Sequence, residues 1–246
     1  MKKILLAAVM VFLFSGIDRA TAQLLSLPNS DVNYKCKTGR KLGVTDIDIN
    51  WNAPGVKGRE GKIWGTSIAH YGFTVLGFGS NTESPWRAGA DENTTISFST
   101  DVTINGQKLP AGKYGFFIAL YPDSCTLIFS KNTAGWGSYF YNKDWDVMRV
   151  GARQQKDMKE SRERLEYNFS RQTDHSVEIA LEWERWRIPF TVEVDLVATT
   201  LHSIRTQLSG AMGFGAPLEG DVSVRQQFWT YNSAGQVLTP DGPLQG

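Results

Sequence analysis

Two turn signals and one alternating run lie within residues 102–120, VTINGQKLPAGKYGFFIAL. Asn105-Gly106 supplies the positive φ angles that both central positions of a type I′ turn require, so the segments on either side are predicted to form a hairpin. Pro110-Ala-Gly112 then reverses the chain again. In the run that follows, four apolar residues fall two apart and share one face of a strand: Tyr114, Phe116, Ile118 and Leu120.

The same alternation recurs on both sides of this stretch, in residues 44–51, 96–104, 125–129, 177–184 and 190–194. Short turns separate these runs, and no helical pattern of about 10–15 residues lies between them. Strands at short intervals predict an antiparallel β-sandwich or jelly-roll-like domain over residues 23–195. A closed barrel is the alternative, because alternation does not determine whether a sheet closes.

After Asp195 the period of the apolar residues changes from two to that of a helix. Val197, Leu201, Ile204 and Leu208 fall on one helical face, and Gly210 is a stop signal. Asp221 is a candidate cap for a second short helix that runs through Trp229. Residues 196–246 are therefore predicted to form a short helical tail, whose Pro- and Gly-rich end is expected to fray.

The amino terminus has the layout of a secretory signal peptide. Lys2 and Lys3 precede an apolar run from Ile4 to Phe14, and Ala20-Thr-Ala22 is a small-x-small cleavage site. Residues 1–22 are therefore predicted to be removed, and the protein is expected in the periplasm or outside the cell. No later run reaches the roughly 18 apolar residues of a membrane span, so we expect no transmembrane segment in the mature chain.

The composition excludes several classes of function. The 246 residues contain 26 Lys and Arg against 25 Asp and Glu, so there is no basic surplus to bind nucleic acid. Three scattered His and two Cys predict neither a metal site nor a disulfide-dense scaffold, and no cofactor-binding loop is present. Cys36 and Cys125 either pair in the oxidising compartment or remain small thiols within strands, and the sequence leaves both readings open.

The densest group of reactive side chains lies in residues 85–95, PWRAGADENTT. Trp86, Arg87, Asp91 and Glu92 are candidate ligand-binding residues, because a guanidinium, two carboxylates and an indole suit a carboxylate or a sugar. The same set can run acid–base chemistry if burial raises one carboxyl pKa. The motif has no nucleophile–base pair. The favoured interpretation is therefore structural: Arg87 is predicted to form an ion pair with Asp91 or Glu92 that fixes the loop.

Two further groups of side chains each allow a functional and a structural interpretation. Trp136 and Tyr139, in the aromatic stretch 136–141 that Trp145 follows, either stack on sugar rings or pack in the core, and core packing is favoured. Glu178, Glu182 and Glu184 offer the paired carboxylates that a glycosidase needs. They alternate with apolar residues, so a solvated sheet face is the favoured interpretation.

Residues 42–195 resemble the bacterial domain-of-unknown-function family numbered twenty-nine eleven. The matching segments are residues 54–59, 63–65, 101–106, 109–114, 136–139, 183–184 and 188–190, together with the 85–95 motif. The resemblance implies an exported bacterial protein with a β-rich domain and no established activity. Family members often continue into tetratricopeptide-like helices, of which only residues 197–208 are recognisable here.

Three functions remain open from the sequence. The first is a non-enzymatic exported module that binds a small ligand, a glycan or another envelope protein. The second is a hydrolase that uses Arg87, Asp91 and Glu92. The third is a purely structural protein of the envelope. Convergence of the motif side chains in one concave pocket favours binding or catalysis, whereas their use in loop hydrogen bonds favours structure.

Export is directly testable. Protein recovered from the periplasm or the medium is expected to begin at Gln23, because cleavage follows Ala22. Amino-terminal sequencing checks this expectation. An intact Met1 in soluble cytoplasmic protein would contradict it.

Overall fold

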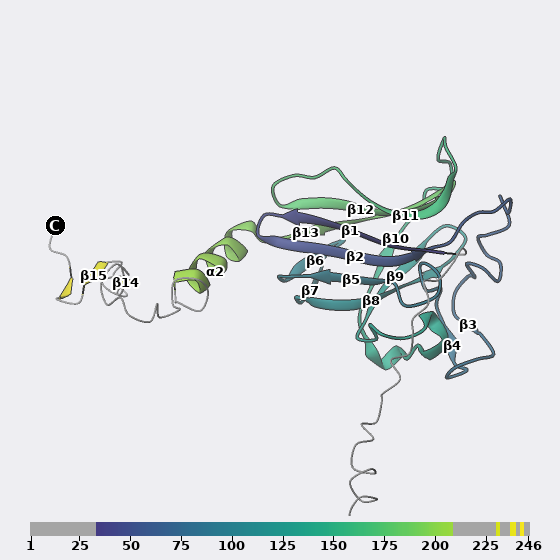
Figure 1. The fold of residues 1–246 in the computed structure, drawn as a ribbon, viewed down its shortest axis with the longest axis horizontal. Helices are drawn as coiled ribbons and strands as arrows, with labels where there is room; N and C mark the ends of the chain where they lie inside the picture. The colour runs from purple at the N-terminus through teal and green to yellow at the C-terminus, as the bar shows by residue number, and fades with distance from the viewer. Residues whose placement is uncertain (1–32, 209–229, 232–236, 240–241, 244–246) are drawn as a thin grey trace, which may run out of the picture.

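The chain forms two packed antiparallel sheets followed by a short helix, as Figure 1 shows for a computed structural model. The structure describes residues 33–208, 230–231, 237–239 and 242–243. The prediction of a mainly β domain with a helix near the carboxyl end is confirmed. The signal peptide at 1–22 and the second helix expected over 221–229 lie outside the described residues.

The first sheet has six strands in the order β1-β2-β5-β8-β9-β10. Their bounds are β1 Tyr34–Leu42, β2 Thr45–Ala53, β5 Thr95–Phe98, β8 Gly112–Leu120, β9 Cys125–Ser130 and β10 Asp146–Ala152. Every neighbouring pair is antiparallel. The alternation in β8 therefore places Phe116 and Ile118 on the face that meets the second sheet.

The second sheet has five strands in the order β11-β12-β13-β6-β7. Their bounds are β6 Val102–Ile104, β7 Gln107–Leu109, β11 Arg162–Ser170, β12 Ser176–Glu184 and β13 Trp186–Glu193. Asn105 and Gly106 have φ angles of 45° and 85°, so the predicted two-residue turn joins β6 to β7. This hairpin crosses to the second sheet, and the chain then returns to the first sheet at β8.

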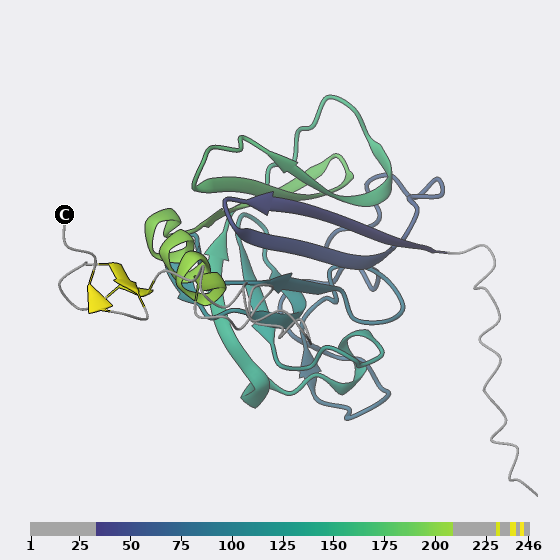
Figure 2. The same cartoon turned by 60° about the vertical axis from the view of Figure 1, so that its left-hand side comes forward.

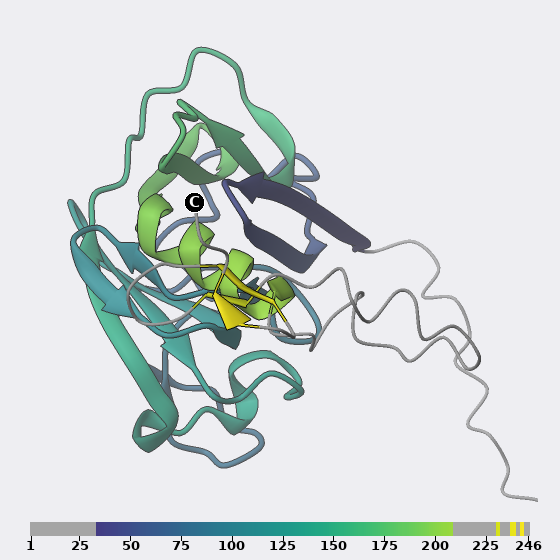
Figure 3. The same ribbon diagram turned by 90° about the vertical axis from the view of Figure 1, so that its left-hand side faces the viewer.

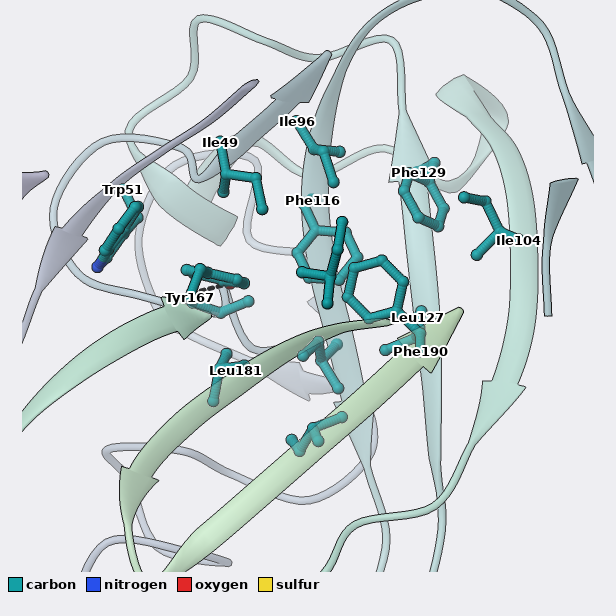
Figure 4. Close-up of a cluster of buried hydrophobic side chains, with 14 of the residues drawn as sticks. Ile49, Trp51, Ile96, Ile104, Phe116, Leu127, Phe129, Tyr167, Leu181 and Phe190 are labelled. Carbon is teal, nitrogen blue, oxygen red and sulfur yellow. Dashed lines mark hydrogen bonds between the residues drawn. The ribbon is translucent and has the colours of Figure 1, made fainter. Parts of the chain in front are cut away.

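Aromatic and aliphatic side chains from both sheets fill the space between them (Figure 4). Phe116 lies at the centre, with ring centroids 5.2 Å from Phe129 and 5.7 Å from Phe190. Trp51 packs edge-on against Tyr167 and donates its indole N–H to the Leu165 carbonyl at 2.9 Å. The core thus unites strands that lie far apart in the sequence.

The two sheets approach each other at both edges but remain separate ladders. β1 contacts β11 at one edge, and β10 contacts β7 at the other. In Figures 2 and 3 the purple β1–β2 hairpin lies beside the green β11–β12 hairpin. The strand orders give two sheets rather than one closed barrel, which resolves the alternative that the sequence left open.

The central strands of the first sheet are also buried on their outer face. Phe117, Ala119 and Ile128 point away from the main core and form a second cluster with Tyr141 and Phe73. The covering segments are β3 Thr74–Val75, β4 Glu83–Ser84 and the 3₁₀ turns η1 Gly137–Phe140 and η2 Lys143–Trp145. Figure 1 shows β3 and β4 at the lower right, with β11 and β12 above. The chain therefore adds a partial third layer.

Helix α2, Leu196–Leu208, begins directly after the β domain. Asp195 caps it, accepting a hydrogen bond from the Ala198 N–H at 2.9 Å. Beyond the helix the described residues include three short strands, β14 Thr230–Tyr231, β15 Val237–Thr239 and β16 Gly242–Pro243. The segment predicted as a helical tail therefore also contains paired strands.

The strand order settles how the cysteines are used. Cys36 lies in β1 and Cys125 in β9, with β2, β5 and β8 between them, and both thiols are free. Neighbouring strands are about 4.8 Å apart, whereas a disulfide requires Cα atoms within about 7 Å. Pairing is therefore geometrically excluded in this fold.

Protein purified without reductant and then unfolded is expected to titrate as two thiols per chain. Ellman's reagent in denaturant measures this number, and the Cys125→Ala variant should titrate as one. A wild-type chain without titratable thiols, running as a monomer on a non-reducing gel, would contradict the strand order.

Candidate functional site

Two motifs that are separate in the sequence meet in the structure. The Ser138 hydroxyl donates a hydrogen bond to the Pro85 carbonyl at 2.5 Å, and the Asn93 N–H donates to the Gly135 carbonyl at 3.1 Å. The 85–95 segment is thereby joined to Ser138, within the aromatic 136–141 segment, and to Gly135, just before it. No pattern in the sequence indicates this junction, because the two segments lie about fifty residues apart.

Arg87 lies at the centre of this junction. Its Nη1 donates to the Asp91 carbonyl at 2.9 Å, and its Cζ lies 4.8 Å from the centroid of the Tyr139 ring. Gly137 adopts a left-handed φ of +60°, and a Cβ atom there would lie 2.5 Å from the guanidinium carbon. Only glycine therefore allows the 136–141 backbone to approach Arg87 this closely.

The predicted ion pair of Arg87 with Asp91 or Glu92 is wrong. Across the described ranges, no carboxylate oxygen lies within 4.0 Å of the Arg87 guanidinium. Asp91 has a left-handed φ of 52°, and its backbone carbonyl rather than its side chain meets Arg87. Arg87 does fix the loop, but through a carbonyl and a ring.

The two carboxylates of the motif are engaged elsewhere. Asp91 accepts a hydrogen bond from Asn33 at 2.9 Å. Glu92 accepts from Lys35 and from Asn52, each at 2.8 Å, and the hydrogen bond from Lys35 holds the pKa of Glu92 below its usual value. The set of Arg87, Asp91 and Glu92 therefore does not converge on one reacting position.

Trp86 faces the core, not the solvent. It is 3% exposed and belongs to a tryptophan cluster with Trp64, Trp183 and Trp186. Its ring centroid lies 5.5 Å from that of Trp64 and 6.3 Å from that of Trp183. Trp86 therefore anchors the motif, and its buried ring is not free to stack on a ligand.

His70 lies near Arg87 and was not singled out as a site residue from the sequence. Burial and the positive charge of Arg87 lower its pKa, so the imidazole is neutral at neutral pH. Its Nδ1 is buried and makes no hydrogen bond within the part of the chain that the structure describes. The arrangement thus places a neutral imidazole, not a compensating anion, beside the guanidinium.

A hollow of about 770 Å³ lies on the covering layer of the six-stranded sheet. Its lining combines apolar rings with polar side chains: Phe73, Ser80, Thr82, Glu83, Phe140, Tyr141, Asn142, Lys143, Trp145 and Arg149. Phe140 and Trp145 are 47% and 45% exposed. Trp136 is equally exposed at 49% but does not line the hollow, and neither does Tyr139.

A hydrogen-bonded triad underlies the hollow. The Tyr141 hydroxyl donates to Asp146 Oδ2 at 2.5 Å, and Arg149 donates to the same oxygen at 2.8 Å and to the Tyr141 oxygen at 2.9 Å. Burial, together with the neighbouring carboxylate, raises the pKa of Tyr141, so its phenol is neutral. The triad therefore holds the Tyr141 and Arg149 side chains of the lining in place and contains no ionised phenol.

The acidic row on β12 does not form a solvated face, contrary to the sequence-based interpretation. Glu182 and Glu184 are buried, and the Glu178 carboxylate is largely covered. Arg187 bridges two of them, reaching Glu178 at 2.6 Å and Glu182 at 3.1 Å. Glu184 Oε1 accepts the Gly61 N–H at 2.6 Å. Each carboxylate already has a partner, so the row is a structural network.

Residues 34–192 match the model of a family described as a protein of unknown function, DUF2911. The chain belongs to the DUF2911 family. No curated protein and no solved structure matches it. Within the described part of this DUF2911 protein, no helix has the length and apolarity to cross a membrane.

The acidic network offers a matched test of burial. Arg187 and Arg171 both pair with Glu178, but their side chains are 15% and 78% exposed. Arg187→Ala is expected to lower the free energy of unfolding by about 3 kcal/mol, because it leaves the covered carboxylates of Glu178 and Glu182 without their arginine partner. Arg171→Ala should cost at most about 1 kcal/mol. Urea unfolding compares them, and equal losses would contradict the burial argument.

The same comparison has a defined pH dependence. Burial alone would raise the pKa of Glu178, but the Arg187 and Ser170 hydrogen bonds hold it below its ordinary value of 4.5. Its stabilising contribution is therefore complete above pH 4.5 and is lost as the pH falls through the lower folded value. The difference in the free energy of unfolding between wild type and Arg187→Ala, measured by urea unfolding at each pH, should therefore become smaller in that acidic range.

Proposed function

We propose that this DUF2911 protein is an exported, non-enzymatic binding module whose aromatic hollow takes a saccharide of the cell envelope. The observation that supports this most is the hollow itself, in which the exposed rings of Phe140 and Trp145 stand beside polar side chains. Its volume of about 770 Å³ falls within the range of roughly 300–1,000 Å³ that is usual for small-ligand sites.

The chemistry of the lining fits a sugar ring. A pyranose has an apolar C–H face that packs on aromatic rings and a rim of hydroxyls that requires hydrogen-bonding partners. Phe140 and Trp145 provide the rings. Ser80, Thr82 and Glu83 offer hydroxyl and carboxylate groups from the opposite segment.

The hollow is ordered before any ligand arrives. The Ser80 N–H donates to the Tyr139 carbonyl at 2.9 Å, which ties the 80–83 segment to η1. Asn142 accepts from the Asp144 N–H at 2.9 Å and caps η2. A site that is already fixed loses little conformational entropy on binding, which favours recognition of a weakly interacting ligand.

The hydrolase alternative has less support. The Asp91 and Glu92 side chains are engaged by Asn33, Lys35 and Asn52, and Arg87 contacts neither carboxylate. Among the described residues, Glu83 is the one carboxylate that lines the hollow, and no hydrogen bond or ion pair engages it there. Burial and the neighbouring carboxylate keep the Tyr141 phenol neutral. This arrangement favours binding over bond cleavage.

Trp145→Ala is expected to weaken saccharide binding roughly tenfold, because loss of an aromatic packing contact costs on the order of 1.5 kcal/mol. Isothermal titration of the mature chain with tetramers of N-acetylglucosamine, glucose and mannose measures the affinities. Trp136→Ala is the matched control, since Trp136 is similarly exposed but lies outside the hollow, and it should bind as wild type does. No binding of any tetramer by wild type, or equal losses in both variants, would overturn the proposal.

A further inference from the structure

Arg87 has hydrogen-bonding capacity that the fold does not use. Its Nη1 is bonded to the Asp91 carbonyl, whereas Nε and Nη2 have no hydrogen-bond partner among the residues that the structure describes. Neither nitrogen is among the unpartnered atoms that are completely buried, and the Arg87 side chain as a whole is partly exposed. One edge of the guanidinium is therefore a vacant pair of donors.

The guanidinium is held in place although this edge is vacant. The carbonyl of Asp91, the ring of Tyr139 and the backbone of Gly137 fix its position. An arginine side chain that is already ordered loses less conformational entropy when it binds. The protein thus presents a rigid planar fork rather than a flexible surface charge.

The positive charge of Arg87 is also uncompensated. Glu83, Asp91 and Glu92 are the nearest acids in the sequence. Among the described residues Glu83 forms no ion pair with Arg87, and the side chains of Asp91 and Glu92 bond to Asn33, Lys35 and Asn52. The neighbouring His70 is neutral. Arg87 is half-buried, so water screens its charge less than that of an exposed arginine.

We propose that the Nε–Nη2 edge of Arg87 is a binding site for the carboxylate of a small ligand, separate from the aromatic hollow. A guanidinium edge matches two carboxylate oxygens in bidentate geometry. One cation balances one negative charge, which favours a carboxylate over a phosphate dianion. Arg87 does not line the hollow. The exposed Phe78 ring packs edge-on against Tyr139, the ring that Arg87 also contacts, with ring centroids 5.2 Å apart, so an exposed apolar ring adjoins the aromatic support of the site.

Nitrogen-15 NMR of the arginine Nε–H groups tests the site in the mature chain. Benzoate is the main probe, with acetate and inorganic phosphate as comparison anions. The Arg87 signal is expected to shift saturably with benzoate, more weakly with acetate because the apolar contact is missing, and least with phosphate. A non-saturating shift shared by all arginines, or tighter binding of phosphate than of benzoate, would overturn the proposal.

Two variants complete the test. Arg87→Lys keeps the charge but loses the fork, and it should reduce benzoate affinity at least tenfold. Arg40→Lys is the matched control, because Arg40 also stacks on a ring, with its Cζ 5.5 Å from the Phe169 centroid, and its loss should leave affinity unchanged. If Arg87→Lys fails to fold, the benzoate titration of the Arg87 Nε–H signal in the wild-type protein still tests the site.

The carboxylate site and the saccharide hollow can fail separately. Trp145→Ala alters the hollow and should leave benzoate binding intact. Loss of benzoate binding in Trp145→Ala would place the anion in the hollow and overturn the separate site. Absence of tetramer binding bears only on the hollow, because none of the Arg87 contacts involves its lining residues.

Discussion

The burial of β8 and β9 on both faces is the constraint on which the site depends. Phe116 and Phe129 belong to the core between the sheets, whereas Phe117 and Ile128 point the other way. Fully burying such a side chain is worth about 1.5–3 kcal/mol, so the outer face requires a cover. Phe73 and Tyr141 provide it, and they bring the 71–85 and 135–145 segments onto the sheet.

The candidate sites follow from this cover. Tyr141 packs on the outer cluster and also hydrogen-bonds to Asp146 beneath the hollow, so one residue links the packing to the site. The bond from Ser138 to Pro85 ties the two covering segments together and brings Gly137 against Arg87. The vacant guanidinium edge and the aromatic hollow are therefore parts of one added layer rather than of the sandwich core.

The sequence predicted those features that depend on neighbouring residues. Period-two alternation gave the strands, and Asn105-Gly106 gave a turn whose positive φ angles are present. The sequence did not predict that the acidic side chains of β12 are covered. Glu178 is covered by Arg187 of the neighbouring strand β13, and alternation within one strand cannot reveal a partner on another strand. The partner of Arg87 was missed because a left-handed φ at Asp91 presents the carbonyl instead of the carboxylate. The unpaired cysteines follow from strand order, which periodicity leaves open.

Amide hydrogen exchange of wild type and Phe117→Ala tests most directly whether the cover is part of the folded unit. In wild type, the amides of Ser80, Asn93 and Tyr141 should be strongly protected, because each bonds to a carbonyl within the layer. Phe117→Ala should remove protection in the 73–85 and 135–145 segments while β12 and β13 keep theirs. Wild-type exchange in those segments at the rate of an unfolded chain would contradict the account.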